Sequence, residues 1–147
     1  MISPELLRRY PCFAATGEES LKAVAMIAEE KPIPAGTHLF GEGDPADLMS
    51  IVASGEVNIQ YFLGSGERRT VDTLVAGDIL GWSALVEPYK YTAIGTASKD
   101  TQLVVIQAQR LRDLCTKDPA LGYRLMTEVA KLLAHRLEGA RVQLATT

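Results

Sequence analysis

The sequence contains only two cysteines and two histidines among its 147 residues. Cys12 and Cys115 lie far apart, form no Cys-x-x-Cys spacing and have no neighbouring histidine, so metal, iron–sulfur and redox sites lack a ligand set. His38 and His135 fall on a predicted strand and a predicted helix, without close spacing. We therefore expect no metal ion, and both cysteines are predicted to be small buried side chains.

Long apolar runs and excess positive charge are also absent. No apolar run approaches the roughly 18 residues that span a bilayer, and residues 1–20 lack the regions of a secretory signal. We therefore predict a cytoplasmic protein that does not bind membranes. The 15 Lys and Arg residues face 18 Asp and Glu residues, a net charge of −3. Because negative charge opposes binding to phosphate backbones, we expect no nucleic-acid binding by this chain alone.

The first clear pattern is an amphipathic helix in "TGEESLKAVAMIAEE", residues 16–30. Thr16 has a side chain suited to a helix N-cap, and Glu19 follows three residues later, as in a capping box. The apolar residues on one face of this helix are Leu21, Val24, Ala25 and Ala28. We predict a helical preface over residues 3–30 that packs on the rest of the chain.

Between residues 32 and 107, short apolar runs alternate with glycines, a pattern that predicts many short strands. In "EVNIQYF" the apolar residues alternate with Asn58 and Gln60, and "LGSGERR" then turns the chain toward "TVDTL", so we expect a β-hairpin. The run "LVVI" at residues 103–106 predicts a strand buried on both faces. We predict a mainly β fold with flanking helices, an antiparallel jelly roll or barrel of about eight strands.

Two helical patterns follow, at residues 108–118 and 119–145, and Pro119 suits the first turn of the second. Apolar residues recur in that long helix with alternating spacings of three and four, which forms an unbroken heptad seam. The seam consists of Tyr123, Met126, Ala130, Leu133, Leu137, Ala140 and Leu144. A second stripe consists of Leu121, Leu125, Val129 and Leu132. Either both stripes pack on the barrel, or only the second one does and the seam forms a homodimer, which we favour.

Four segments resemble a known family: "PCFAATGEESLKAVA", "PAGTHLFGEGDPADLMSIVASGEV", "AGDILGWSAL" and "YTAIGTASKDTQLVVI". They resemble the cyclic-nucleotide-binding domain of the catabolite activator protein and FNR regulators, which is also found in cyclic-nucleotide-gated channels and kinase regulatory subunits. The resemblance implies one domain over residues 1–147, with a double-stranded β-helix over residues 32–107 and helices over residues 108–145. It also implies that residues 77–93 occupy the place of the family's phosphate-binding cassette. In that cassette, backbone N–H groups at a helix start face the phosphate.

The two side chains with which this family reads a cyclic nucleotide differ here. The family pattern Gly-Glu-Leu-Ala becomes Gly81-Trp82-Ser83-Ala84, and Arg-Ser/Thr-Ala becomes Tyr91-Thr92-Ala93. The resemblance thus implies that Trp82 replaces the glutamate that binds the ribose, and that Tyr91 replaces the arginine that binds the phosphate. The rings either fill the old pocket, which we favour, or line a new one for an apolar or planar ligand.

The candidate ligand-binding residues are Gly81, Trp82, Ser83, Ala84, Lys90, Tyr91, Thr92, Ala93, Arg124 and Thr127. Lys90 lies one position before the arginine slot and is expected on the surface, because neighbouring strand residues face opposite sides. Arg124 and Thr127 are included because the long helix covers the cassette in the family.

These observations predict a non-catalytic regulatory or sensor module that acts through its C-terminal helix on an unidentified protein partner. We expect no cofactor, and only weak binding of cAMP or cGMP. An alternative is the effector domain of a catabolite activator or FNR-type transcription regulator whose helix-turn-helix domain lies outside this sequence. A metal-dependent enzyme of the cupin type is disfavoured by the scarcity of histidine. A nucleophile elbow is disfavoured too, because "GWSAL" lacks the second glycine of Gly-x-Ser-x-Gly.

Overall fold

The computed structural model describes residues 1–146. Two short helices and a 3-10 helix precede the strands, a second 3-10 helix interrupts them, and two helices follow. The elements are α1 (Pro4–Arg8), η1 (Pro11–Phe13), α2 (Glu18–Ile27), β1 (Ala28–Ile33), β2 (His38–Phe40), β3 (Leu48–Ser54), β4 (Val57–Phe62), β5 (Arg68–Leu74), β6 (Ile79–Leu80), η2 (Trp82–Leu85), β7 (Ile94–Ala97), β8 (Thr101–Gln107), α3 (Ala108–Lys117) and α4 (Pro119–Ala145).

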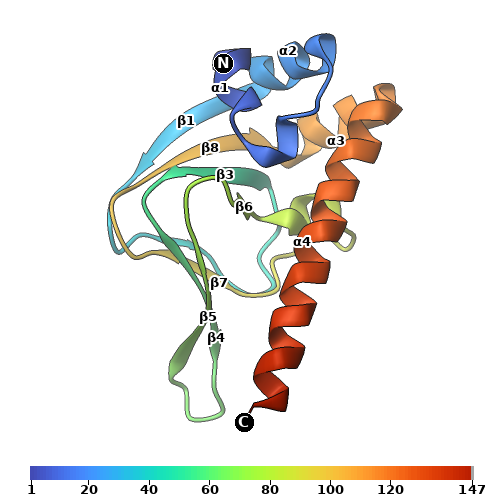
Figure 1. Cartoon of the computed structure of the whole chain (residues 1–147). Helices are drawn as coiled ribbons and strands as arrows, with labels where there is room; N and C mark the ends of the chain where they lie inside the picture. Colours follow the sequence, from blue (N-terminus) through green and yellow to red (C-terminus); the bar gives the residue numbers. More distant parts are fainter. Residues whose placement is uncertain (147) are drawn as a thin grey trace.

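Two four-stranded antiparallel sheets form the β-roll (Figure 1). One sheet has the strand order β1-β8-β3-β6 and the other has the order β2-β7-β4-β5. Helices α1, α2 and α3 gather at one end of the roll, and α4 runs alongside it toward the tip of the β4–β5 hairpin (Figure 1). The predicted fold class, mainly antiparallel β with flanking helices and a long C-terminal helix, is confirmed.

Strand β8 and the β4–β5 hairpin agree with the prediction from the sequence. The residues Leu103, Val104, Val105 and Ile106 are all buried, and β8 pairs with β1 on one side and β3 on the other. The hairpin contains a β-bulge: Ile59 pairs with Asp72, but Gln60 pairs with Thr70, so Val71 is the extra residue of β5. A bulge of this kind changes which side chains share a face of the strand.

Helix α2 differs from the prediction at both ends. Its N-cap is Gly17 rather than Thr16, and no side chain caps it. The Thr16 side chain is buried instead. The helix also ends earlier than predicted, because Ala28 begins β1 and pairs with Ile106 of β8. Pairing with a buried central strand therefore overrides the helical pattern that Ala28 continues in the sequence.

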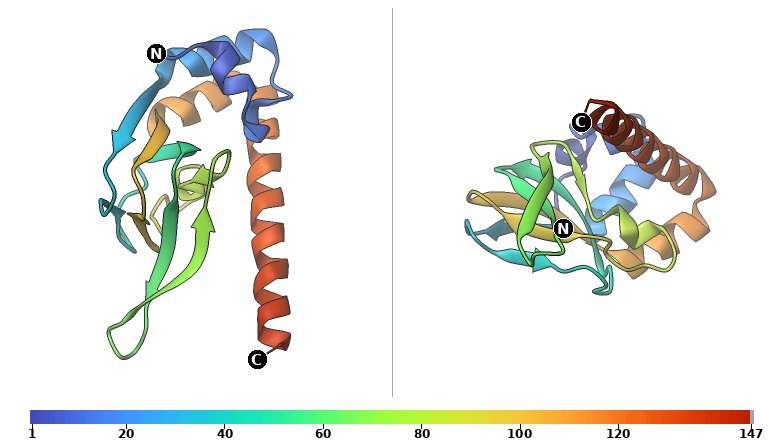
Figure 2. Two further views of the ribbon diagram at one scale, coloured as in Figure 1. Left: turned by 60° about the vertical axis from the view of Figure 1, so that its left-hand side comes forward. Right: turned by 90° about the horizontal axis from the view of Figure 1, so that it is seen from below.

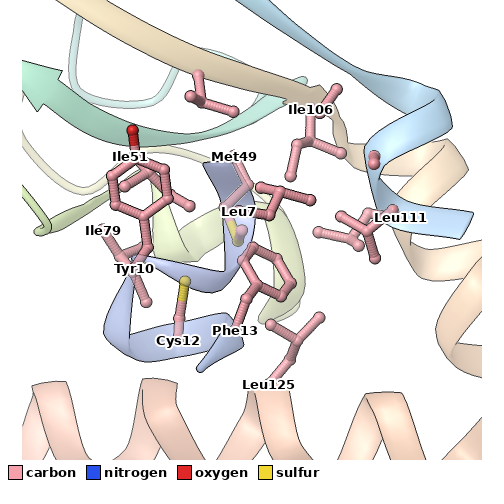
Figure 3. Packing of buried hydrophobic residues seen from close by; sticks show 14 of the residues in the cluster. Leu7, Tyr10, Cys12, Phe13, Met49, Ile51, Ile79, Ile106, Leu111 and Leu125 are labelled. Carbon is pink, nitrogen blue, oxygen red and sulfur yellow. The ribbon is translucent and has the colours of Figure 1, made fainter. Parts of the chain in front are cut away.

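A hydrophobic core joins the N-terminal helices, the first sheet and the last two helices (Figure 3). Phe13 of η1 lies beside Leu7 of α1 and Met49 of β3, and all three side chains are fully buried. Leu111 of α3 and Leu125 of α4 complete this cluster. Each fully buried side chain of this size contributes about 1.5 to 3 kcal/mol relative to exposure, so this cluster fixes the start of α4 against the roll.

Helix α4 has fully buried residues only along its N-terminal half. It begins at Pro119, and the Asp118 carboxylate caps it by accepting a hydrogen bond of 3.2 Å from the Leu121 N–H. The Ser20 hydroxyl also donates to this carboxylate, which lowers the pKa of Asp118. Of the residues from Pro119 to Ala145, the buried ones are Leu121, Leu125 and Val129. The predicted second stripe therefore packs on the core, whereas the half of α4 after Val129 has no buried residue through Ala145.

Cys12 should be unreactive in the folded protein. Burial raises the pKa of its thiol to about 12, and only the thiolate attacks disulfide reagents. Since the folded pKa is raised, the thiol stabilises the fold fully below the ordinary value of about 8.5 and loses this contribution as the pH rises toward the folded value. In a Cys115→Ser background at about pH 8, we expect no labelling of native protein by Ellman's reagent and one equivalent after unfolding. Rapid labelling of the native protein would contradict this burial.

Candidate functional site

A cavity of about 760 Å³ lies between the β-roll and the C-terminal half of α4. Its volume falls in the range of small-molecule sites, about 300 to 1,000 Å³. Figure 2 shows α4 running beside the β4–β5 hairpin, and these two elements with η2 provide most of the walls. The lining residues are Phe40, Ile59, Tyr61, Arg69, Val71, Asp72, Leu74, Ile79, Gly81, Trp82, Ser83, Tyr91, Thr92, Ala93, Leu133, His135, Arg136, Gly139, Ala140, Gln143 and Leu144.

Gly81 positions the cassette wall of this cavity. It caps η2 with φ 85°, a left-handed conformation that residues with a side chain rarely adopt. A Cβ atom at this position would also lie 2.8 Å from the carbonyl oxygen of Leu48. Both the backbone conformation and the lack of space therefore require glycine at this position. The turn at Gly81 places Trp82 and Ser83 at the cavity wall.

Tyr91 is held by the scaffold on both its ring and its hydroxyl group. The ring stacks on Phe40 with centroids 3.9 Å apart and an interplanar angle of 9°. The hydroxyl donates a hydrogen bond of 3.1 Å to the Leu48 carbonyl, while burial raises the pKa of Tyr91. Gly95 makes room for this stack, because a Cβ there would lie 2.5 Å from Phe40. Tyr91 is thus part of the wall, and the cavity remains open beside it.

Arg136 and Asp72 form an ion pair across the cavity wall, between α4 and β5. The other Asp72 oxygen accepts a hydrogen bond of 2.9 Å from the Thr73 N–H. The Arg136 Nε–H is buried and has no acceptor among the described residues. Burial lowers the pKa of Arg136. The guanidinium is therefore partly desolvated and only partly paired, a costly arrangement for a cation.

The β-bulge explains why Arg69 faces the cavity together with Asp72. In a regular strand, Val71 and Asp72 would point to opposite faces. Because Val71 is the extra residue, Asp72 lies opposite Ile59 and Arg69 lies opposite Tyr61, and all five side chains line the cavity. No residue pattern of the sequence indicates a bulge here, so the inward orientation of Arg69 could not be predicted.

The position of Arg136, by contrast, is indicated in the sequence by the spacing of an apolar stripe on α4. The stripe of Leu121, Leu125, Val129 and Leu132 continues with the same spacing through Arg136, Gly139 and Gln143, and these last three residues line the cavity. Because they are polar or small, they did not extend an apolar stripe. The face of α4 that packs on the core is thus the face that borders the cavity one turn later.

Six of the candidate ligand-binding residues line the cavity, and four do not. The lining residues are Gly81, Trp82, Ser83, Tyr91, Thr92 and Ala93. Ala84 is buried beneath the cassette, and Lys90 is exposed outside the cavity, with its backbone bridged to Pro45. Arg124 is exposed on α4, and the Thr127 hydroxyl donates a hydrogen bond of 2.8 Å to the Tyr123 carbonyl of its own helix. These two helix residues lie on the packed half of α4, too far toward its start to reach the cavity.

The predicted seam of α4 divides into two groups. Tyr123, Met126 and Leu137 have exposed side chains away from the cavity, and Ala130 is also exposed. Leu133, Ala140 and Leu144 border the cavity, although Leu144 is also 76% exposed. The apolar surface available to a partner helix is therefore centred on the first group.

Arg112 connects the cassette to α3. One of its Nη atoms donates a hydrogen bond of 2.7 Å to the Ala84 carbonyl of η2. Its guanidinium carbon also lies 4.1 Å from the centre of the Tyr89 ring, a distance at which a cation and an aromatic ring attract each other. This contact therefore connects η2 to α3, the helix that leads directly into α4.

Residues 1–146 contain no group of three or more His, Cys, Asp or Glu side chains arranged to hold a metal ion. His38 is exposed on β2, and His135 is exposed at the edge of the cavity. Within the same residues, no helix is long and apolar enough to cross a lipid bilayer.

Residues 30–118 match the family model of the cyclic nucleotide-binding domain. A solved structure from Geobacter metallireducens, described as that of a candidate cyclic nucleotide-binding protein, is 40% identical with a TM-score of 0.84, over 93% of this chain and 99% of that one. The cyclic AMP receptor protein of Thermus thermophilus is 27% identical over 91% of this chain and 60% of its own length. The CRP-like cAMP-activated global transcriptional regulator of Mycobacterium tuberculosis is 24% identical over 96% of this chain and 61% of its own length. The chain therefore spans about three fifths of these curated relatives.

Proposed function

Because the chain belongs to the cyclic nucleotide-binding domain family, we propose that it is a non-catalytic regulatory module whose cavity controls the position of α4. One observation carries this proposal: the cavity has the cassette as one wall and the unpacked half of α4 as another. A molecule that enters or leaves the cavity would change the contacts of α4 with the roll without disturbing the core at Leu121, Leu125 and Val129.

The cassette residues support weak binding of cyclic nucleotides. Trp82 and Tyr91 line the cavity at the positions where the family resemblance places a glutamate and an arginine. An indole cannot accept the hydrogen bonds that a carboxylate accepts from a ribose, and a phenol carries no positive charge at neutral pH. Tyr91 also uses its hydroxyl on the Leu48 carbonyl. The cassette side chains therefore offer no charged partner for a cyclic phosphate.

The exposed residues Tyr123, Met126 and Leu137 support assembly through α4. In this proposal the module acts in the cytoplasm as a homodimer, and its output is the separation or the angle of the two α4 helices. A protein partner would read that output. Part of the seam, Leu133, Ala140 and Leu144, also borders the cavity, so one helix position determines both.

A second candidate is the effector domain of a transcription regulator. It is favoured by the regulator of Mycobacterium tuberculosis, of which the matched region covers 61%. In that case α4 would pass the state of the cavity to a DNA-binding domain rather than to a separate protein. Both candidates use the same cavity and the same helix.

Thermal unfolding with and without cyclic nucleotides tests the proposed specificity. A micromolar site would stabilise the fold by about 2.7 kcal/mol at a hundredfold excess over its Kd, which corresponds to a Tm rise of several degrees. For this protein we expect about 100 μM cAMP or cGMP, a hundredfold excess over a micromolar Kd, to raise the Tm by less than about one degree. A rise of several degrees with either nucleotide would reject weak binding.

A further inference from the structure

We propose that the cavity binds a small carboxylic acid with an apolar body, and that its carboxylate is held by Arg136 in place of Asp72. The proposal rests on the function proposed above, since it assumes that this cavity is a ligand site. It goes further because it names the class of ligand and the residue that selects it. Neither Arg136 nor Asp72 belongs to the cassette.

The pairing of Arg136 is incomplete. A guanidinium has five N–H donors in a planar fork that matches two carboxylate oxygens. The ion pair joins one Asp72 oxygen to an Nη atom of Arg136, and the other Asp72 oxygen accepts a hydrogen bond from the Thr73 N–H. The Arg136 Nε–H stays buried without an acceptor among residues 1–146. A ligand carboxylate with two free oxygens would satisfy more of these donors than Asp72 does.

The charges around the cavity favour an anion. The lining contains two arginines, Arg69 and Arg136, and a single carboxylate, that of Asp72. Within the described residues Arg69 forms no ion pair, although it lies on the same strand face as Asp72. A monoanion that enters this cavity therefore meets a net positive wall.

The remaining walls favour an apolar body. Ile59, Leu74 and Ile79 line the side of the sheets, and Leu133 lines the side of α4. Gly139 leaves further space, because a Cβ at this position would meet no atom of residues 1–146 within 4 Å. A nucleotide would place several hydroxyl and ring nitrogen atoms against these side chains without partners, which costs free energy for each group.

A single carboxylate also fits better than a phosphate. Arg136 already holds a carboxyl group of the same size and charge, that of Asp72, at this position. A phosphate dianion would have to lose more hydration in a partly buried site. The exchange of one carboxylate for another leaves the charge beside Arg136 unchanged, while the released Asp72 can turn toward solvent at the edge strand β5.

Decanoate is a suitable probe, with decanol as its uncharged counterpart. Trp82 is the only tryptophan of the chain and lies in the cavity wall, so its fluorescence reports on occupancy directly. We expect saturable quenching or enhancement by decanoate below its micelle-forming concentration. We expect decanol to bind at least about tenfold more weakly, which corresponds to about 1.4 kcal/mol for the lost charged hydrogen bonds.

Four variants give the test its controls. Arg136→Gln should weaken decanoate binding about tenfold or more and leave decanol binding unchanged. Asp72→Asn should tighten decanoate binding, because it removes the competing carboxylate. Gly139→Leu should block both probes by filling the cavity. Arg141→Gln removes a positive charge from an exposed position of α4 outside the cavity and should change nothing. Circular dichroism of each variant establishes that α4 is intact.

Equal binding of decanoate and decanol, or an Arg136→Gln variant that binds decanoate as well as wild type, would overturn carboxylate recognition. No fluorescence change with wild type and with Asp72→Asn would overturn the ligand class altogether. Either outcome leaves the proposed regulatory function standing if cAMP and cGMP also fail to bind. A micromolar response to a cyclic nucleotide would instead reject the proposed specificity itself, so the two failures are distinguishable.

Discussion

Replacing Trp82 by glutamate and Tyr91 by arginine together should raise the affinity of the protein for cAMP. The change supplies the ribose acceptor and the phosphate cation of the family pattern at the two cassette positions that line the cavity. A hydrogen bond to a charged group contributes about 1.5 to 3 kcal/mol, so the pair contributes about 3 to 6 kcal/mol. At about 1.4 kcal/mol per tenfold, the expected gain in affinity is about a hundredfold to ten-thousandfold.

The structure adds two physical conditions to this expectation. Arginine at position 91 gives up the stack on Phe40 and the bond to the Leu48 carbonyl, so the double variant should be less stable than wild type without ligand. The left-handed Gly81 must be retained, because it presents residue 82 to the cavity. Ligand binding should then restore part of the lost stability.

Calorimetric titration with cAMP and cGMP measures this effect. The control is the double variant Trp82→Gln with Tyr91→Leu, which also removes both rings but adds no charge. It should bind cyclic nucleotides no better than about tenfold over wild type, because it supplies space alone. If wild type and the charged variant both bind at micromolar concentration, then Trp82 and Tyr91 do not determine ligand choice.

Glutamate at Met126 and Leu137 should abolish the dimer that we propose to form through α4. The two side chains are 43% and 52% exposed in the single chain, and they lie on the seam of α4 away from the cavity. In a symmetric dimer each substitution places two carboxylates in a desolvated apolar seam, at a cost of several kcal/mol for each buried ion. This cost opposes the free energy that the apolar contacts of the seam contribute to dimer formation.

Sedimentation velocity at micromolar concentration checks the assembly. Wild type should have about twice the chain mass of 15.9 kDa, and the double variant should have the mass of one chain. The control is Arg124→Glu with Lys131→Glu, which also introduces two acidic residues, but at exposed positions off the seam. That control should remain a dimer. A monomeric wild type, or a dimeric seam variant, would contradict assembly through α4.

The architecture was predictable because the local sequence patterns along most of the chain agree with the elements that form in the folded protein. The glycine-punctuated strands and Pro119 at the start of α4 each point to the structure that forms. The disagreement at Ala28 has a tertiary cause: the residue continues a helical pattern, but β8 offers it a buried strand partner, Ile106. No local pattern can represent a partner nearly 80 residues away in the sequence.

The cavity was less predictable than the cassette. The cassette could be located because Gly81 and Ala93 retain a spacing that resembles a family. Arg136 is a polar residue in line with an apolar stripe, so the stripe alone does not indicate it. The bulge that turns Arg69 inward follows from strand pairing rather than from composition. Arg124 and Thr127 were placed by the resemblance alone, and in this chain α4 presents a later turn to the pocket.

Helix α4 has the mechanics of a lever. Its pivot is the buried stretch that ends at Val129, and at 1.5 Å per residue the arm from Val129 to Ala145 is about 24 Å long. Arg136 lies about 10 Å along that arm, so a displacement of about 2 Å at the cavity becomes about 4 to 5 Å at the end of the helix. In the proposed function, the end of α4 would therefore move more than twice as far as Arg136.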